Sequence, residues 1–363
     1  MARVFRILAL GGDGIGPEIL EQGLRVVEAA ASAAGLTIEI DHALLHGAAW
    51  EVEGAFCSGE TLAAARASDA LLVGAVGGPR WDDIRVPGGP EMQDGLMYLR
   101  HHLQAYLGLR PARSWQRLLS RTPFRPEIVN GADVLVLREM CGGAMFANER
   151  GQRSVNGRRQ GFDLITYDEE EIARFARGGF ELARTRRGRV ASADKSNVME
   201  SYKLWREVVT EVSRDYPDVA FENMFADNCG YQLMMRPRDF DVVLCCNQLG
   251  DLFSDLIGAY AGSLGMLPSA CLAGPPAPGV LGIYESTSGS APDIAGQGIA
   301  NPIGTILSAA MMFRFSFGAP GIAARIETAV DQVIESGLAT PDIGGVETTA
   351  SITDAVLTAM DAK

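Results

Sequence analysis

The chain has 363 residues, of which 47% are hydrophobic, so it can bury a large core and we expect two domains. Its formal net charge of -13 argues against nucleic-acid binding, because the phosphate backbone attracts basic proteins. No apolar run approaches the roughly 18 residues needed to cross a bilayer, and the first apolar stretch is too short for a secretion signal. These features predict a cytoplasmic protein that binds neither nucleic acid nor membrane.

Strand-like apolar runs alternate with amphipathic helices along the chain, which favours an α/β fold with a substantially parallel sheet. The first strand is expected over 4–10, followed by a glycine-rich turn at 11–16 and a helix with Pro17 in its first turn. Buried strands are expected at 70–76 and 133–137. In folds of this kind, functional residues gather at the carboxyl ends of strands.

Two later helices have clear sequence signals. Asp168 can cap a helix that starts near Glu169, because Glu171 completes a capping box. A second helix is expected over 197–216 and ends before Pro217. Their apolar faces should be buried and comprise Ile172, Phe175, Ala176, Gly179, Phe180 and Ala183 in the first helix and Val198, Tyr202, Trp205, Val209 and Val212 in the second.

Asp251 and Asp255 lie four residues apart, shortly after an apolar run. If a helix starts near Gln248, this spacing places both carboxylates on one face, where they repel each other. A divalent cation would remove the repulsion, because hard metals bind carboxylate oxygens, and Asp227 is a third candidate ligand. The alternative is that acidic residues favour a helix N-terminus through its dipole. The spacing alone leaves both interpretations open.

The stretch from Gly12 to Glu18, Gly-Asp-Gly-Ile-Gly-Pro-Glu, looks like a dinucleotide-binding loop. It lacks the Gly-x-Gly-x-x-Gly spacing of that motif, so we do not expect a Rossmann fold. A tight strand-to-helix turn explains the glycines better.

Arg100, Arg110 and Arg138 lie beside apolar, strand-like runs or at their ends. Guanidinium groups bind carboxylates through two parallel hydrogen bonds, so three converging arginines would hold a dicarboxylate. Solvated surface arginines are the more common alternative.

Lys195 follows a predicted strand and precedes a predicted helix. A lysine near positive charges and a metal can act as a base, because its pKa is lowered there. The alternative is a surface lysine at a helix start, a place that the helix dipole disfavours.

A series of short motifs runs through nearly the whole chain. They are, in order, Gly12-Asp-Gly-Ile-Gly-Pro-Glu18, Ala75-Val-Gly-Gly-Pro79, Leu99-Arg100, Leu109-Arg-Pro111, Arg138-Glu139 with Gly142-Gly143, Asp194-Lys195, Asp227-Asn228, Gly250-Asp251, Ser254-Asp255, Gly289-Ser-Ala-Pro-Asp-Ile-Ala-Gly296 and Gly298-Ile-Ala-Asn-Pro302. Together they resemble the isocitrate/isopropylmalate dehydrogenase family of β-decarboxylating dehydrogenases.

The resemblance implies a two-domain fold with a parallel or mixed sheet, in which both chain ends (1–105 and 262–363) build a cofactor-side domain. Residues 106–261 would form a substrate and dimerisation domain, with the catalytic cleft between the two. It further implies a homodimer with shared active sites. The implied activity is NAD-dependent oxidative decarboxylation of a 3-alkylmalate, 3-isopropylmalate above all, as in leucine biosynthesis.

The same resemblance assigns roles to the candidate residues. The three arginines would clamp the malate carboxylates. Asp251 and Asp255 would bind Mg2+ or Mn2+ together with the partner subunit's Asp227. The partner subunit's Lys195 would be the base for the C2 hydroxyl group.

The resemblance also implies that NAD lies along the segment 285–301 and not on a Rossmann loop. Asp293 with Ile294 resembles the NAD-preferring form, in which a carboxylate accepts the ribose hydroxyls and repels a 2'-phosphate. The implied cofactor contacts are Glu285, Gly289, Ser290, Ala291, Asp293, Ile294 and Asn301, together with Asn197.

Two departures from the family pattern bear on the last proton transfer. The family normally has a tyrosine, the acid that protonates the enolate carbon, where this chain has Met145, and a thioether has no proton to give. The family usually has a methionine where this chain has Tyr231, four residues after Asp227 and hence on the same helical face. One hypothesis is an exchange that places the phenol of Tyr231 in the neighbouring subunit's site. The other is that Tyr231 fills core or interface space.

The substrate's 3-substituent should contact Leu96 and Met97, which are apolar and precede Arg100. Gln93 stands where family members often have glutamate. An apolar wall suits an alkylmalate better than isocitrate, which would need a polar partner for a third carboxylate. A paralogue acting on another 3-substituted malate, and an impaired dimer that only binds a metal–dicarboxylate complex, remain alternatives.

Overall fold

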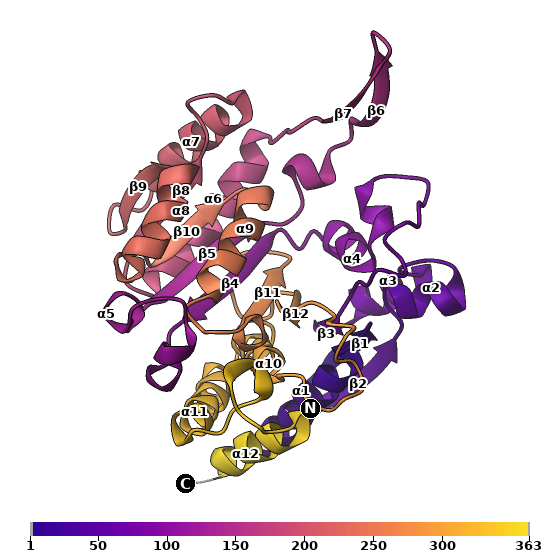
Figure 1. The fold of residues 1–363 in the computed structure, drawn as a ribbon, viewed down its shortest axis with the longest axis vertical. Helices are drawn as coiled ribbons and strands as arrows, with labels where there is room; N and C mark the ends of the chain where they lie inside the picture. Colours follow the sequence, from indigo (N-terminus) through magenta and orange to yellow (C-terminus); the bar gives the residue numbers. More distant parts are fainter. Residues whose placement is uncertain (1–2, 362–363) are drawn as a thin grey trace.

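A mixed ten-stranded β-sheet formed by the described residues runs through the molecule (Figure 1). The structure is a computed structural model and describes residues 3–361. The strand order is β2-β1-β3-β12-β11-β4-β5-β10-β8-β9, and β6 pairs only with β7 in a separate hairpin. The strands are β1 (Val4–Gly12), β2 (Thr37–Ala43), β3 (Ala70–Ala75), β4 (Leu107–Arg113), β5 (Asp133–Glu139), β6 (Arg150–Val155), β7 (Arg158–Asp163), β8 (Arg189–Asp194), β9 (Ala220–Phe225), β10 (Val242–Cys245), β11 (Pro268–Leu272) and β12 (Gly282–Ser286).

Helices cover both faces of this sheet (Figure 1). On one face α6 and α7 pack together over one half of the sheet, and α1 and α10 pack over the other. The opposite face carries α8 and α9 in the first half and α2, α3 and α4 in the second. The helices are α1 (Gly16–Ala33), α2 (Gly47–Glu53), α3 (Gly59–Ala67), α4 (Gly95–Leu103), α5 (Pro126–Val129), α6 (Glu169–Arg184), α7 (Glu200–Ser213), α8 (Ala226–Met235), α9 (Asn247–Gly258), α10 (Ile303–Phe315), α11 (Pro320–Ser336) and α12 (Thr349–Asp361).

The sheet is parallel toward both edges and antiparallel at its centre. Strands β12, β11, β4 and β5 pair antiparallel in that order, and the remaining neighbours pair parallel. The predicted α/β class with a mixed sheet is therefore confirmed.

The strand order also groups the chain into two halves. The strands from residues 4–75 and 268–286 occupy one end of the sheet, and those from residues 107–245 occupy the other. This grouping agrees with the expected division at residues 105 and 262, which stays a prediction because one continuous sheet joins the halves. The β6–β7 hairpin, exposed along nearly its whole length, projects away from the body (Figure 1).

Local sequence signals account for α6 in detail. Asp168 accepts a hydrogen bond from the Glu171 backbone, and Glu171 accepts one from the Asp168 backbone, so the predicted capping box is present. All the residues predicted on its apolar face are buried.

By contrast, α7 begins at Glu200 and not near residue 197. The prediction that Val198 is buried is therefore wrong, because Val198 lies in the turn before the helix and is 67% exposed.

Alternating side chains of β1 enter two separate parts of the core. Ile7 and Ala9 pack in the cluster that contains Val26 of α1, whereas Leu8 and Leu10 pack in the cluster on the other face.

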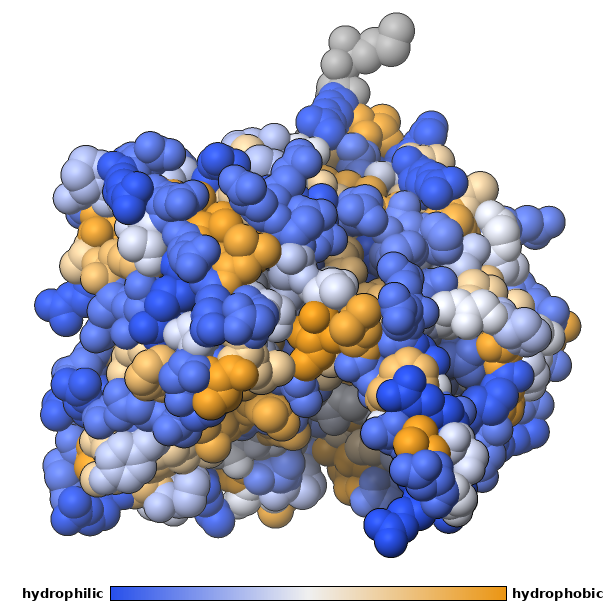
Figure 2. All heavy atoms as spheres, turned by 90° about the horizontal axis from the view of Figure 1, so that it is seen from above, coloured by the Kyte–Doolittle hydropathy of each residue, from blue (hydrophilic) through white to orange (hydrophobic). Residues whose placement is uncertain are grey.

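None of the helices among residues 3–361 is long and apolar enough to span a membrane. The face shown in Figure 2 is largely hydrophilic, with apolar patches between the polar side chains.

Candidate active site

A cavity of about 340 Å³, here called the front cavity, opens where the two halves of the sheet meet. Strands β4, β5 and β12 supply its floor, and helices α4 and α9 supply its sides. Its lining combines arginines and carboxylates with an apolar wall and comprises Ala75, Val76, Asp94, Leu96, Met97, Arg100, Arg110, Arg138, Met140, Met145, Phe146, Asn247, Asp251, Glu285, Ser286, Thr287 and Gly289.

Three buried arginines reach the front cavity from different elements: Arg100 from α4, Arg110 from β4 and Arg138 from β5. Arg100 donates a hydrogen bond to Glu285, and an Arg110 nitrogen lies 3.9 Å from the same carboxylate. The convergence expected from the sequence is thus present. The role of these arginines as substrate ligands stays a prediction.

Arg138 is held in place by two partners on α9. Its Nε donates to Asn247 at 2.9 Å, and a terminal nitrogen pairs with Asp251. Gly250 makes this approach possible, because a Cβ there would lie 2.6 Å from the Cβ of Arg138. A side chain at position 250 would therefore push α9 away from β5.

Burial and crowding make this group of arginines receptive to anions. Burial lowers the pKa of Arg138 to about 10; Asp251 opposes this shift, and Arg110 and Arg100 add to it. Burial also opposes the charge on Arg100, but Glu285 outweighs it and raises the pKa of Arg100. The buried Nε atoms of Arg100 and Arg110 have no hydrogen-bond partner within the described part of the chain. A ligand carboxylate would satisfy such donors, which are costly to leave unpaired.

Asp251 and Asp255 lie on α9, which begins at Asn247, one residue before the predicted start. Asp251 lines the front cavity, and Asp255 follows one turn later. Desolvation and then the charge of Asp251 raise the pKa of Asp255. The two carboxylates therefore repel each other as their spacing predicts, and a cation between them would relieve that repulsion.

Lys195 and Asp227 lie together, but outside the lining of the front cavity. Lys195 follows β8, Asp227 lies in the first turn of α8, and Nζ is 2.6 Å from Oδ1. The hydrogen bond from Lys195 lowers the pKa of Asp227. Among residues 3–361, no cluster of three or more histidine, cysteine or acidic side chains is arranged to hold a metal. One chain therefore does not bring Asp227 together with Asp251 and Asp255.

The two positions that depart from the family pattern lie in different surroundings. Met145 lines the front cavity, with its sulfur 3.0 Å from a terminal nitrogen of Arg138. Tyr231 lies on α8 and is 60% exposed, so the interpretation that it fills the core is wrong. A place for Tyr231 in an interface, or in a neighbouring subunit's site, stays a prediction.

The segment expected to hold NAD starts in the front cavity and continues over the glycine-rich turn. Glu285 and Gly289 line the cavity. The carbonyl of Ser290 accepts a hydrogen bond of 2.8 Å from the backbone of Ile15. Gly14 allows this contact, because a Cβ there would lie 2.0 Å from the Ser290 oxygen.

The other expected cofactor residues differ in how free their side chains are. Ala291 and Ile294 are partly buried beside a small apolar cluster, and Asp293 is exposed. The side chain of Asn301 accepts from Ile303 and donates to Asp342, both at 3.0 Å, so it is already engaged. Asn197 is exposed in the turn after Lys195, outside the cavity lining.

Sequence reasoning missed two buried polar residues beside the arginines. Asn247 accepts from Arg138 and donates to the Gly142 carbonyl at 3.1 Å. Glu139 accepts hydrogen bonds of 2.8 Å from the backbones of Cys141 and Gly142, and burial raises its pKa to about 7. A polar residue immediately after an apolar run, as at position 247, was the available signal.

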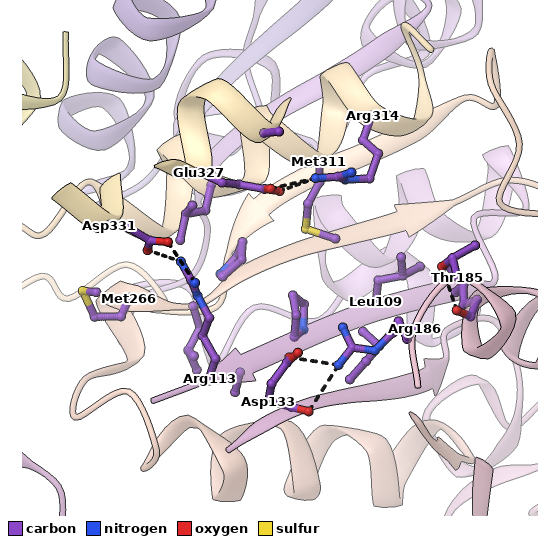
Figure 3. Close-up of a pocket in the computed structure, with 18 of the residues that line it drawn as sticks. Leu109, Arg113, Asp133, Thr185, Arg186, Met266, Met311, Arg314, Glu327 and Asp331 are labelled. Carbon is purple, nitrogen blue, oxygen red and sulfur yellow. Dashed lines mark hydrogen bonds and ion pairs between the residues drawn. The ribbon is translucent and has the colours of Figure 1, made fainter. Parts of the chain in front are cut away.

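A larger cavity of about 480 Å³, here called the rear cavity, lies on the other face of the same two strands (Figure 3). Side chains alternate along a strand, so Leu109 and Pro111 line the rear cavity and Arg110 lines the front cavity. On β5, Leu135 and Arg138 divide in the same way.

The charges around the rear cavity are paired within the chain. Figure 3 shows each labelled arginine side chain directed at a carboxylate. The pairs are Arg113 with Asp331, Arg314 with Glu327 at 2.7 Å, and Arg186 with Asp133 at 2.9 Å. The front cavity is therefore the better candidate for an anionic ligand.

Comparisons with known proteins agree with this architecture over its full length. A family model described as isocitrate/isopropylmalate dehydrogenase matches residues 6–356. A protein of Methylococcus capsulatus named 3-isopropylmalate dehydrogenase is 46% identical over 362 residues, which is 98% of this chain and 99% of that protein. One of the same name from Aquifex aeolicus is 44% identical over 357 residues, covering 97% of this chain and 96% of that protein.

Solved structures show the same fold. The crystal structure of isocitrate dehydrogenase from Methylococcus capsulatus covers 99% of this chain and 100% of its own, with a TM-score of 0.85 and 30% identity. A β-decarboxylating dehydrogenase from Thermococcus kodakarensis covers 98% of this chain and 96% of its own, with a TM-score of 0.79 and 30% identity. Since the sequence and fold matches both extend over nearly the whole chain, it belongs to the isocitrate/isopropylmalate dehydrogenase family.

Proposed function

We propose that this chain is an NAD-dependent, metal-requiring dehydrogenase that oxidises and decarboxylates 3-isopropylmalate to 4-methyl-2-oxopentanoate, a step of leucine biosynthesis. The front cavity carries the proposal, because three buried arginines converge there and the Nε atoms of Arg100 and Arg110 have no hydrogen-bond partner among the described residues. Full-length identity of 46% to a protein named 3-isopropylmalate dehydrogenase supports it.

The substrate would lie with its carboxylates on Arg100, Arg110 and Arg138. Its alkyl group would contact Leu96 and Met97, which line the same cavity. Because that wall is apolar, an alkyl substituent is preferred there over a third carboxylate.

Asp251 and Asp255 would hold Mg2+ or Mn2+, with a third carboxylate from the partner subunit's Asp227. The fit rests on the mutual repulsion of the two α9 carboxylates and on the preference of hard cations for carboxylate oxygens. When bound, the ion would polarise the C2 oxygen and stabilise negative charge there as the carboxylate departs.

The partner subunit's Lys195 would take the proton of the C2 hydroxyl as hydride leaves C2. Such a shared site requires a dimer. Exposed apolar side chains on α8 and α9 support it, since Tyr231, Met235 and Leu252 are 60%, 50% and 61% exposed.

NAD would lie along the segment that starts at Glu285 and rests on the glycine-rich turn. Its nicotinamide would accept the hydride from C2. The exposed Asp293 carboxylate would accept the ribose hydroxyls. The engaged side chain of Asn301 would shape this segment more than bind the cofactor directly.

The loss of CO2 leaves a carbon that must take a proton, and Met145 cannot supply one. We propose that Tyr231 of the neighbouring subunit supplies it, because it shares a helical face with Asp227. A Tyr231→Phe variant should lower kcat about 100-fold, the lower range for a general acid. If Tyr231→Phe leaves decarboxylation unchanged, the exchange is wrong; rescue of a slow enzyme by Met145→Tyr alone would instead indicate a lost acid.

The overall test is NADH production with Mn2+ and racemic 3-isopropylmalate, beside isocitrate, malate and tartrate. Turnover of 3-isopropylmalate alone supports the proposal, and faster turnover of another substituted malate would indicate a specialised paralogue. The position of Met145 favours one further candidate, a dimer that binds a metal–dicarboxylate complex without turnover. Thermal stabilisation by these ligands without NADH production would support that candidate.

A further inference from the structure

His46 is held in a backbone conformation that side chains with a Cβ rarely adopt. Its φ of 55° and ψ of -125° lie in the region that glycine tolerates best. Such strain persists only where the surrounding structure over-determines it, and it clusters at functional sites. Two backbone hydrogen bonds, from His46 to Phe56 at 2.7 Å and from Trp50 to His46 at 2.8 Å, hold the residue there together with the contacts of its imidazole.

One side of the imidazole binds a buried carboxylate. Nδ1 of His46 lies 2.8 Å from Asp13, and the two side chains are 8% and 1% exposed. Asp13 also accepts backbone hydrogen bonds from Gly47 at 3.2 Å, Ala48 at 2.9 Å and Gly77 at 2.8 Å. This carboxylate thus joins the glycine-rich turn, the loop at His46 and the segment after β3.

The other side of the imidazole faces the start of α4. Nε2 lies 3.8 Å from Asp94, whose carboxylate caps the helix by accepting from Leu96 at 2.7 Å and Met97 at 2.8 Å. The contact is close along the backbone as well, because a Cβ on Gly95 would lie 3.0 Å from the His46 nitrogen. His46 therefore lies directly against this helix start.

The ring is also confined by aromatic neighbours. Phe56 stacks on it with a centroid distance of 4.8 Å, and Trp81 meets it edge-on at 6.0 Å. With Nδ1 bound to Asp13 and the ring packed against Phe56 and Trp81, the imidazole lies between two segments that are far apart in sequence.

Both of these segments form one wall of the front cavity. Ala75 and Val76 come from the side tied to Asp13, and Leu96 and Met97 come from the helix capped by Asp94. We propose that His46 is a positioning residue that sets the distance between these two segments. It thereby selects the 3-substituent of the substrate, a branched alkyl group. The inference rests on the proposed function, since the wall is the expected site for that substituent.

The test compares a substituted with an unsubstituted substrate in the full-length enzyme with Mn2+ and NAD. In His46→Gly the backbone strain is removed, so the fold should persist while both imidazole contacts are lost. We expect KM for 3-isopropylmalate to rise about tenfold, the lower range for altered packing of a methylene or more, with KM for malate unchanged. Equal changes for both substrates, or no change for either, would overturn the proposal.

Two further variants separate positioning from general structural damage. His46→Asn keeps a donor near Asp13 but is too short to face Asp94, so KM for 3-isopropylmalate should stay raised; full recovery would overturn the coupling to α4. Asn156→Gly is the matched control, because Asn156 has a φ of 52° in the turn of the exposed β6–β7 hairpin. It should leave both KM values unchanged.

Dissociation constants measured calorimetrically with Mn2+ make the test independent of turnover. If the wild-type chain turns over none of the substrates, the proposed function fails. The inference about His46 then still predicts weaker binding of 3-isopropylmalate, and not of malate, by His46→Gly. Equal affinities for wild type and variant would overturn it.

Discussion

The front and rear cavities lie on the same two strands and contain the same residue types, but their arginines differ in how completely they are paired. In the rear cavity every labelled arginine in Figure 3 points at a carboxylate of its own chain. In the front cavity three arginines are buried together, and two of them keep an unpaired Nε among the described residues. Buried donors without acceptors destabilise a fold, so they indicate a place that a ligand completes. The larger cavity is therefore the poorer candidate site.

The largest expected effect is the loss of Arg138 from the front cavity. Arg138→Ala leaves Asp251 and the substrate carboxylate without their cationic partner. We therefore expect kcat/KM to fall about 100- to 1000-fold, as for truncated buried charge pairs. Steady-state kinetics would measure it. Arg113→Met in the rear cavity is the control and should keep kcat/KM within about twofold. Similar losses in both variants would remove the distinction between the cavities.

The next effect is a pH dependence that originates behind the front cavity. Burial raises the pKa of Glu139 from 4.5 to about 7, so the folded state binds this proton more tightly than the unfolded state. Stability from this group is then present below pH 4.5 and is lost as pH rises to about 7, by about 3 kcal/mol. Urea unfolding at a series of pH values should show a shallower decline for Glu139→Gln than for wild type.

Arg113→Met again serves as the control, because an arginine side chain does not titrate in this range. Its stability should decline with pH as steeply as that of wild type. A Glu139→Gln variant with the wild-type slope would show that the decline originates elsewhere in the chain.

A smaller effect is expected from the sulfur of Met145. Met145→Leu keeps the apolar volume but removes the weak acceptor beside Arg138, so KM should rise about two- to fivefold, a modest hydrogen-bond contribution. Met311→Leu makes the same change in the rear cavity and should leave KM unchanged. A larger effect at Met311 than at Met145 would contradict the assignment of the front cavity.

The smallest effect is expected for the rear ion pair itself. Asp331→Asn weakens its contacts with Arg113 and Trp115, but both charged side chains are 38% exposed. Water screens such pairs, so the free energy of unfolding should fall by only about 0.5–1 kcal/mol. Urea denaturation would measure it. A loss as large as that expected from Glu139 would mean that the rear cavity is more tightly structured than its exposure indicates.

Sequence reasoning succeeded where neighbouring residues decide the structure. The capping box at Asp168 and the apolar face of α6 depend on residues within a few positions of one another. The placement of Asp251 and Asp255 on one face of α9 was predictable for the same reason. The prediction that Val198 is buried was wrong because the helix begins three residues later than expected. Helix ends are less sharply defined by the local sequence than helix interiors.

The candidate site was predictable only as a set of residue types. Convergence of Arg100, Arg110 and Arg138 depends on strand order. Arg110 and Arg138 meet because β4 and β5 pair with each other, and Arg100 joins them through Glu285 on β12, which is separated from β4 only by β11. Asn247, which accepts from Arg138, and the neighbouring Glu139 were missed because a polar residue at the end of an apolar run does not by itself show that its side chain becomes buried. The motif resemblance supplied roles for Lys195 and the aspartates that spacing left open.

The sequence by itself determined the α/β class, the capped and amphipathic helices and the family, because hydrogen-bonding partners and apolar periodicity lie close together along the chain. Only the tertiary structure decided which face of β4 and β5 binds an anion, and that Asp227 lies apart from Asp251 within one chain. It alone placed His46, strained, between two carboxylates. Those outcomes depend on how distant segments pack, and packing is a property of the whole sheet.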